Sequence, residues 1–183
     1  MGIQMEFYER IEDQNKLEDI WGILCECDKE FIPALSSRES SYQSTLQVED
    51  NQGGLPHLYY EEIIKQHFIL AVDGGKVIGF MTFKSNYRCQ ELKGFTPSNY
   101  ITTICVKKDY RNQGITGLFY KIIQSAQIPD DVRMPYISTR TWSLNHAHIH
   151  ILESIGFQES ERIVNHRGNG VDTIYFSKEI VNN

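Results

Sequence analysis

The chain has 183 residues, of which 40% are hydrophobic and 11% aromatic, enough apolar material for the core of one domain. This composition excludes a wholly disordered or collagen-like chain. The 18 Lys and Arg residues are outnumbered by 24 Asp and Glu, so the net charge is −6. Such an acidic chain is a poor candidate for nonspecific nucleic-acid binding, which depends on cationic side chains.

Nothing in the sequence predicts a membrane or secreted location. The longest apolar stretch, residues 68–72, is far shorter than the roughly 20 residues of a membrane-spanning helix. Residues 1–6 have neither the basic flank nor the apolar stretch of a signal peptide. The cysteines show no CxxC spacing and are expected to be reduced thiols: Cys25, Cys27, Cys89 and Cys105. We therefore expect a cytoplasmic protein with no membrane partner.

The first third of the chain predicts an edge strand and helices. Residues 3–8 alternate weakly, as an edge strand does. Asn15, with Glu18 three positions later, resembles a capping box, and apolar residues at helical spacing follow it. Residues 33–56 form a long, serine-rich connection in which we expect a helix over 42–48.

The remaining two thirds predict strands and three more helices. After the first of these helices we expect a hairpin with a Gly-Gly turn. Each of the other two helices is expected to lie between two later strands. The predicted helices are 59–66, 115–126 and 145–155, the last ending at Gly156. The predicted strands are 67–72, 77–83, 100–106, 134–142, 157–164 and 171–177.

This order predicts an α/β (α+β) fold. A mixed, largely antiparallel sheet of about seven strands, with helices on both faces, satisfies it. Strands 100–106 and 134–142 should run parallel, because a helix crosses between them.

The segment 106–117, VKKDYRNQGITG, carries the clearest chemical signal. It follows a strand and opens a helix, where backbone N–H groups without internal partners favour an anion. Glycines allow close approach of a pyrophosphate, and Arg111 adds positive charge. Neither the GxxxxGK[ST] nor the GxGxxG phosphate motif is present.

At this point the sequence resembles the GNAT superfamily, the Gcn5-related N-acetyltransferases, over about residues 68–180. That family has a strand, then [QR]-x-x-G-x-[GA], then a helix; here Arg111 and Gly114 match, and Thr116 takes the last small position. A second family motif begins at an Asn, matched by Asn145, and ends in Gly-Phe, matched by residues 156–157. The family's usual Ala and Tyr between them are replaced by His148 and Leu152.

The resemblance implies one N-acetyltransferase domain, residues 1–183, that uses acetyl-CoA as acyl donor. It implies that residues 99–127 and 134–157 carry the acetyl-CoA motifs, that the parallel strands splay apart, and that residues 31–60 cover the acceptor side. The implied cofactor-binding residues are Ile104, Cys105, Val106, Arg111, Asn112, Gln113, Gly114, Ile115, Thr116, Gly117 and Asn145.

The catalytic groups are open at this stage. Strand 100–106 has no carboxylate where the family often places a base, and Leu152 cannot donate a proton as the family Tyr does. His148 has an ordinary pKa near 6.5 and is a candidate base. The candidate catalytic residues are His148, Cys105 and Ser143, with Tyr120 as a further possible acid.

The acceptor pocket is expected to include aromatic and polar side chains. The candidates are Tyr42, Tyr100, Thr102, Arg140 and Trp142. His146 and His150 share a helix face, but two ligands without a third make a weak zinc site, so no metal is expected.

These observations predict direct transfer of an acetyl group to the primary amine of a small molecule, by a monomer or homodimer. Two alternatives stay open: a non-catalytic module that binds acyl-CoA, and an interaction domain whose cofactor site has decayed.

Overall fold

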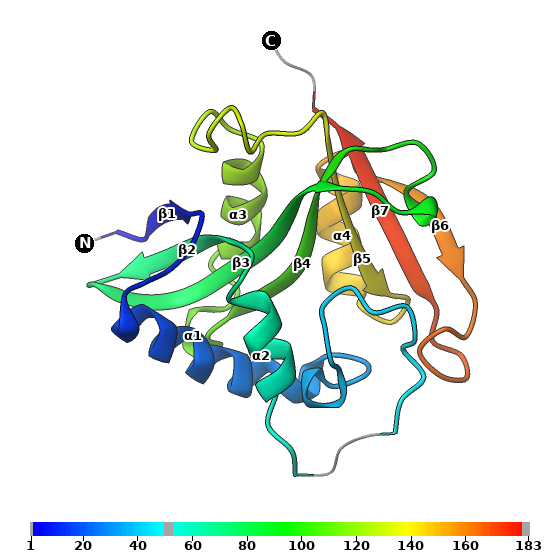
Figure 1. The fold of residues 1–183 in the computed structure, drawn as a ribbon, viewed down its shortest axis with the longest axis horizontal. Helices are drawn as coiled ribbons and strands as arrows, with labels where there is room; N and C mark the ends of the chain where they lie inside the picture. Colours follow the sequence, from blue (N-terminus) through cyan, green and yellow to red (C-terminus); the bar gives the residue numbers. More distant parts are fainter. Residues whose placement is uncertain (1, 50–52, 181–183) are drawn as a thin grey trace.

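A seven-stranded sheet forms the centre of the protein in the computed structural model, which describes residues 2–49 and 53–180 (Figure 1). The strands lie in the order β1-β2-β3-β4-β5-β7-β6. Their bounds are β1 Gln4–Tyr8, β2 His67–Asp73, β3 Lys76–Tyr87, β4 Ser98–Val106, β5 Tyr136–Trp142, β6 Gln158–Ile163 and β7 Thr173–Glu179. The expected mixed sheet is confirmed.

One parallel pair interrupts an otherwise antiparallel sheet. β4 and β5 pair in parallel from Ser98↔Tyr136 to Ile101↔Thr139, and every other neighbouring pair is antiparallel. Beyond Ile101, β4 continues to pair with β3 alone. Thr139 Oγ1 donates to the Ile101 carbonyl at 3.1 Å, which is the last bond across the pair before the strands separate. The predicted parallel pair and its splay are both present.

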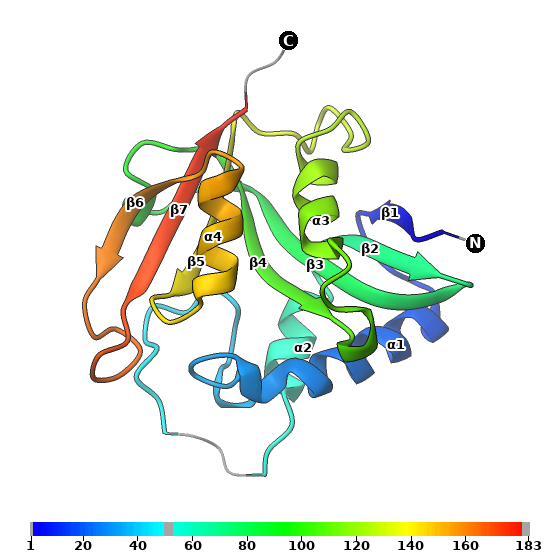
Figure 2. The ribbon, with the colours of Figure 1, turned by 180° about the vertical axis from the view of Figure 1, so that it is seen from behind.

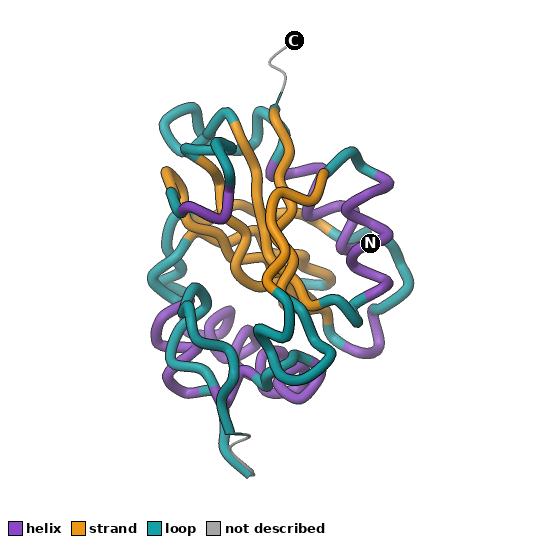
Figure 3. Tube along the Cα trace, turned by 90° about the vertical axis from the view of Figure 1, so that its right-hand side faces the viewer, coloured by secondary structure: helices purple, strands orange, loops and turns teal. Residues whose placement is uncertain are grey.

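Helices cover both faces of the sheet (Figures 2 and 3). One face packs against α1 (Gln14–Cys27) and α2 (His57–Ile63). The other packs against α3 (Ile115–Ile123) and α4 (His146–Ser154). β2 is buried on both faces, so its residues alternate between the two cores instead of between core and solvent.

Helix α1 begins slightly earlier than the sequence predicted. The Asp13 carboxylate accepts the N–H groups of Asn15 and Lys16 at 2.9 and 3.4 Å, so Asp13 is the N-cap and Asn15 is inside the helix. The predicted stripe is otherwise correct, because Ile20 and Leu24 are fully buried against the sheet.

The helix predicted over residues 42–48 is wrong. Residues 42–48 contain no helix in the structure. Two short 3₁₀ turns, η1 (Asp28–Glu30) and η2 (Leu35–Ser37), lie before residue 42. The Gln43 side-chain amide donates to the Thr45 carbonyl at 2.7 Å, and Arg140 donates to the Gln43 carbonyl at 2.8 Å. Tertiary contacts therefore hold backbone groups here, and no helical bonds form.

Other predicted elements are present with shifted ends. α2 ends at Ile63 and α3 at Ile123, each about three residues before the predicted end, while β3 extends to Tyr87. The predicted turn residues Gly74 and Gly75 have φ of 55° and 80°, and Gly156 ends α4 with φ of 88°. These left-handed conformations are the ones glycine adopts without strain.

In the described residues, no helix has the length and apolar character needed to cross a bilayer. The four cysteines are free thiols.

Candidate active site

A cleft of about 450 Å³ opens where β4 and β5 separate. Its walls are the two strand edges, the loop before α3, the first turns of α3 and α4, and the end of α1 with the segment that follows. The lining residues are Cys27, Glu30, Phe31, Ile101, Thr102, Thr103, Ile104, Cys105, Val106, Tyr110, Arg111, Asn112, Gly114, Ile115, Thr116, Gly117, Thr139, Arg140, Thr141, Trp142, Asn145, Ala147, His148 and Ile151.

The residues expected to bind the cofactor are gathered here, with one exception. All of them line the cleft except Gln113, whose side-chain amide donates to the Asp109 carbonyl at 3.4 Å. Asn145 is held at the start of α4 by a bond from its amide to Thr141 Oγ1 at 3.0 Å.

The N-terminus of α3 is open toward the cleft. Gly114 precedes the helix with φ of 78°, and the first backbone bond of the helix runs from the Leu118 N–H to the Gly114 carbonyl at 3.1 Å. No described residue accepts the N–H groups of Ile115, Thr116 or Gly117. A Cβ built on Gly114 or Gly117 would meet no atom within 4 Å, so both glycines border empty space. Free N–H groups at a helix N-terminus beside such space suit a phosphate group.

Arg111 lies beside this helix end but already has partners. Its Nε donates to the Val106 carbonyl at 3.0 Å, and its Nη1 is 2.8 Å from Glu30 Oε1. The hydrogen bond to Glu30 raises the pKa of Arg111. Glu30 is the only acidic residue in the lining given above, so no unpaired carboxylate in that lining is available as a base.

His148 lies at the start of α4 and contacts α3. Its Nε2 is 2.6 Å from the buried hydroxyl of Tyr120. Desolvation lowers the pKa of His148 to about 4, so at neutral pH the ring has one N–H and one lone pair. The pKa of His148 is therefore lower than the ordinary value assumed from the sequence, because the packing of α4 against α3 partly buries the ring.

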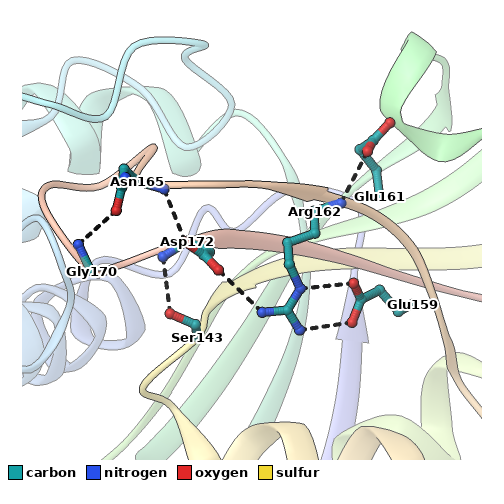
Figure 4. Close-up of polar contacts among 7 residues, drawn as sticks. All are labelled: Ser143, Glu159, Glu161, Arg162, Asn165, Gly170 and Asp172. Atoms are coloured by element: carbon teal, nitrogen blue, oxygen red, sulfur yellow. Dashed lines mark hydrogen bonds and ion pairs between the residues drawn. The ribbon is translucent and has the colours of Figure 1, made fainter.

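The other two catalytic candidates differ in position. Cys105 lines the cleft, but burial raises the pKa of its thiol well above the usual range, which keeps it protonated. Ser143 is outside the lining; its Oγ accepts the Asp172 N–H at 2.9 Å (Figure 4). Leu152, at the family Tyr position, is fully buried in the core beneath α4.

Three of the five predicted acceptor residues line the cleft, namely Thr102, Arg140 and Trp142. Tyr100 is buried elsewhere and stacks on Tyr87 with ring centroids 4.4 Å apart. Tyr42 is 42% exposed beneath Lys84, whose Nζ is 3.7 Å from the ring centroid. The structure therefore places Tyr100 and Tyr42 outside this cleft.

Several lining residues were not predicted from the sequence. Phe31 packs against Trp142 with ring centroids 5.6 Å apart and closes one wall. Ala147 and Ile151 are one helical turn apart on α4, and that spacing was a usable signal. Phe31 carried no such signal, because only the fold brings it to β5. Among the described residues, no group of three possible metal ligands is found.

Comparisons with known proteins agree with this architecture. Residues 35–157, about two thirds of the chain, match the acetyltransferase (GNAT) family. No curated protein sequence matches significantly. Among solved structures, aminoglycoside 6'-acetyltransferase type Ii has a TM-score of 0.69 at 15% identity, covering 98% of this chain and 99% of that one. The N-acetyltransferase from Staphylococcus aureus Mu50 has a TM-score of 0.65 at 12% identity, covering 99% and 100%.

The ribosomal-protein-S18-alanine N-acetyltransferase from Escherichia coli has a TM-score of 0.64 at 14% identity, covering 100% of this chain and 96% of that one. At these identities the likeness concerns the fold alone. The family match includes α3 and its open N-terminus, the parallel pair β4–β5 and the whole of α4, and it ends at Phe157. With this sequence match and this sheet, the chain belongs to the acetyltransferase (GNAT) family, which is a family of acyltransferases.

Proposed function

We propose that this protein transfers an acetyl group directly from acetyl-CoA to the primary amine of a small molecule. The observation that carries the proposal is the set of unpaired N–H groups at the start of α3, which open into the cleft between β4 and β5. A phosphate-rich ligand with a narrow extended arm fits such a site. Hydrogen-bond donors for the phosphates lie at one end, and a free strand edge for the arm lies beside them.

Each part of the cleft has a role in this proposal. The N–H groups of residues 115–117 bind the pyrophosphate, with Arg111 and Asn112 beside it. The backbone of Ile104–Val106 pairs with the pantetheine arm, since β5 no longer occupies that edge. Segment 31–60, of which residues 50–52 lie outside the described residues, forms the acceptor side, and its Phe31 lines the cleft.

The reaction asks little of the protein beyond positioning. The nitrogen of the neutral amine bonds to the thioester carbon and the carbon–sulfur bond breaks. The nitrogen loses one proton, and the departing thiolate takes one up to become the thiol of CoA. An alkyl ammonium of pKa ~10.4 costs about 4.6 kcal/mol to deprotonate at pH 7, whereas a thiol of pKa ~8.5 leaves as thiolate for about 2 kcal/mol. His148 is too weak a base for the first step at its lowered pKa, so we assign it a hydrogen-bonding role toward acceptor or water.

A non-catalytic acyl-CoA-binding module is the second candidate. The observation that favours it is Leu152, a buried apolar side chain where the family usually has a proton-donating Tyr. A proton-bearing alternative is the pair formed by Tyr120 of α3 and His148, which lies one turn before Leu152 on α4. Turnover separates this candidate from the enzyme.

The similar structures do not identify the acceptor. One is named for acetylation of an aminoglycoside and another for a ribosomal-protein alanine, and both have under 25% identity to this chain. We keep a small-molecule amine as the proposed acceptor class. The four free thiols fit the reducing conditions of the cytoplasm, where we propose that the protein works.

Thermal unfolding with and without acetyl-CoA tests the proposal, with CoA and ATP as comparisons. A ligand at about 100 times its Kd adds about 2.7 kcal/mol to the free energy of unfolding. We expect acetyl-CoA and CoA to raise Tm clearly and ATP to have little effect, followed by thiol release with a panel of amines. The absence of any shift at saturating ligand in a well-folded protein would overturn the cofactor assignment, and binding without thiol release would favour the non-catalytic module.

A further inference from the structure

Three arginines from distant parts of the chain lie together beside the cleft. Arg38 comes from the segment after α1, Arg140 from β5, and Arg167 from the turn after β6. Arg38 and Arg167 are only 6% and 7% exposed, and Arg140 lines the cleft. Two of the three arginines lie close to aromatic rings of the cleft wall. The Arg38 guanidinium is 5.8 Å from the Phe31 ring centroid, and that of Arg167 is 5.8 Å from the Trp142 ring centroid.

None of these guanidinium groups forms an ion pair with a carboxylate of the described residues. The contrast is Arg162, which pairs with Glu159 at 2.9 Å and with Asp172 at 3.2 Å (Figure 4).

Nearby acids do not supply the missing partner. Asp28 is buried and attracts Arg38, but its carboxylate accepts the Ser36 N–H at 2.6 Å and lies 3.7 Å from Lys29 Nζ. Glu49 lines a second hollow together with Arg167, without an ion pair between them.

Burying unpaired like charges is unfavourable, because desolvation and mutual repulsion both disfavour the charged form. Desolvation, with repulsion from Arg140, lowers the pKa of Arg38 to about 10. Desolvation and repulsion from Arg38 and Arg140 lower the pKa of Arg167 to about 9. Both side chains nevertheless remain charged at neutral pH. An anion placed among them would offset both the desolvation and the repulsion.

The cluster also has unused donors. Its existing bonds go mainly to carbonyls: Arg38 to Pro33, Arg140 to Ser41, Gln43 and the Tyr175 hydroxyl, and Arg167 to Ile32 and Thr173 Oγ1. These leave Arg38 Nη1 and Arg167 Nη2 with no partner among the described residues. Neither atom is among the fully buried polar atoms that lack a partner. Such forked donors match carboxylate and phosphate oxygens.

We propose that Arg38, Arg140 and Arg167 form an anion-binding subsite for a carboxylate or phosphate group on the acceptor, so that the acceptor is an amine that also carries negative charge. This inference rests on the proposed function, because it names the substrate class of the same cleft. The same three positive charges repel polycationic amines, which should therefore be poor acceptors.

Anion binding is tested first without any acetyl donor. Inorganic phosphate and acetate are each compared with chloride at equal ionic strength, with saturating CoA present so that the N-terminus of α3 is occupied. Each should raise Tm of the wild type by about 2 °C or more. Arg38→Gln and Arg167→Gln should lose the shift, with Arg38→Lys and Arg167→Lys as charge-conserving variants that keep part of it if the Gln forms fail to fold. The control is Arg162→Gln, whose partners are on the chain, and it should keep the full shift. No anion shift in the wild type, or an equal shift in all variants, would overturn the subsite.

Acceptor choice is the second test. Thiol release is measured with matched pairs: amino acids against their amides, and phosphoethanolamine against ethanolamine. We expect the anionic member of a pair to have at least about tenfold higher kcat/KM, or ~1.4 kcal/mol, and spermidine to be poor. Preference for carboxylate or for phosphate identifies the anion. Better turnover of amides and polyamines would overturn the subsite and leave the acetyltransferase proposal standing. An anion-induced rise in Tm in a protein that does not bind acetyl-CoA would instead support the anion site and overturn the acetyltransferase proposal.

Discussion

Two glycines with the same φ angle have different surroundings. Gly114 and Gly170 both have φ of 78°, and a Cβ on either would meet nothing within 4 Å. Gly114 precedes α3 at the cleft, whereas Gly170 lies in the turn between β6 and β7. We expect Gly114→Glu to abolish acetyl-CoA binding in a folded protein, because the carboxylate adds bulk and negative charge where the pyrophosphate should lie. The measurement is the ligand-induced change in Tm.

Gly170→Glu is the matched control, since it imposes the same left-handed strain of about 1–2 kcal/mol away from the cleft. Both variants should lose similar stability without ligand, and only Gly170→Glu should keep the response to acetyl-CoA. A full response in Gly114→Glu would remove the helix N-terminus from the binding site.

At the scale of single residues, the sequence was most informative where a local motif carried the signal. The loop before α3 was predicted from Arg111 and Gly114 because strand, loop and helix are contiguous. The bond from Arg111 to Glu30 joins residues 81 positions apart, and no spacing predicted it. The low pKa of His148 also has a non-local cause, because α3 and the core around Tyr120 desolvate the ring.

At the scale of elements, one side-chain pair joins β4 to β5 at the end where they still pair. Ser98 Oγ and Ser138 Oγ are 2.6 Å apart, and both residues are fully buried. We expect Ser98→Ala to lower the free energy of unfolding by about 1–3 kcal/mol, because the Ser138 hydroxyl is then buried without a partner. The double variant with Ser138→Ala should cost less than the sum of the single changes. Denaturant unfolding of all four proteins measures this coupling.

The comparison for this cycle is Ser154→Ala, whose hydroxyl is exposed and donates to the Ile151 carbonyl. That change should stay within about 0.5 kcal/mol. Strict additivity of the two buried changes would mean that the hydroxyl pair does not hold the strands together.

Elements with their own periodicity were predicted well, and those shaped by tertiary contacts were not. The parallel arrangement of β4 and β5 followed from the intervening helix, and α3 followed from its apolar spacing. Residues 42–48 have a plausible local pattern, but Arg140 donates to the Gln43 carbonyl and the Gln43 side chain donates to the Thr45 carbonyl instead. Propensity is a weak prior when buried donors from another element compete for the same carbonyls.

For the molecule as a whole, acid should reduce stability through His148. The folded pKa of about 4 lies below the ordinary value near 6.5, so the unfolded chain binds a proton first as pH falls. Stability from the neutral ring is therefore complete above about pH 6.5 and is lost progressively down to about pH 4, amounting to about 3 kcal/mol. His148→Gln should lose less stability than the wild type between about pH 7 and pH 4.5. Urea unfolding at the two pH values measures the difference.

His150→Gln serves as the control, because His150 is exposed on the same helix. It should retain the acid sensitivity of the wild type. An acid response in His148→Gln equal to that of the wild type would show that burial of this ring does not govern the pH dependence.

The separation of β4 from β5 also bears on the cohesion of the entire sheet. Strands β1 to β4 form one part and β5, β7 and β6 the other, and the two parts share a direct ladder of only four residue pairs. Beyond the last of these four pairs the cleft separates β4 from β5, and no backbone bonds join the two strands. A molecule bound in the cleft therefore contacts both parts of the sheet. A bound ligand therefore provides contacts between β4 and β5 where the strands do not pair with each other. The residues that bind the ligand are then also the residues through which it can stiffen the sheet.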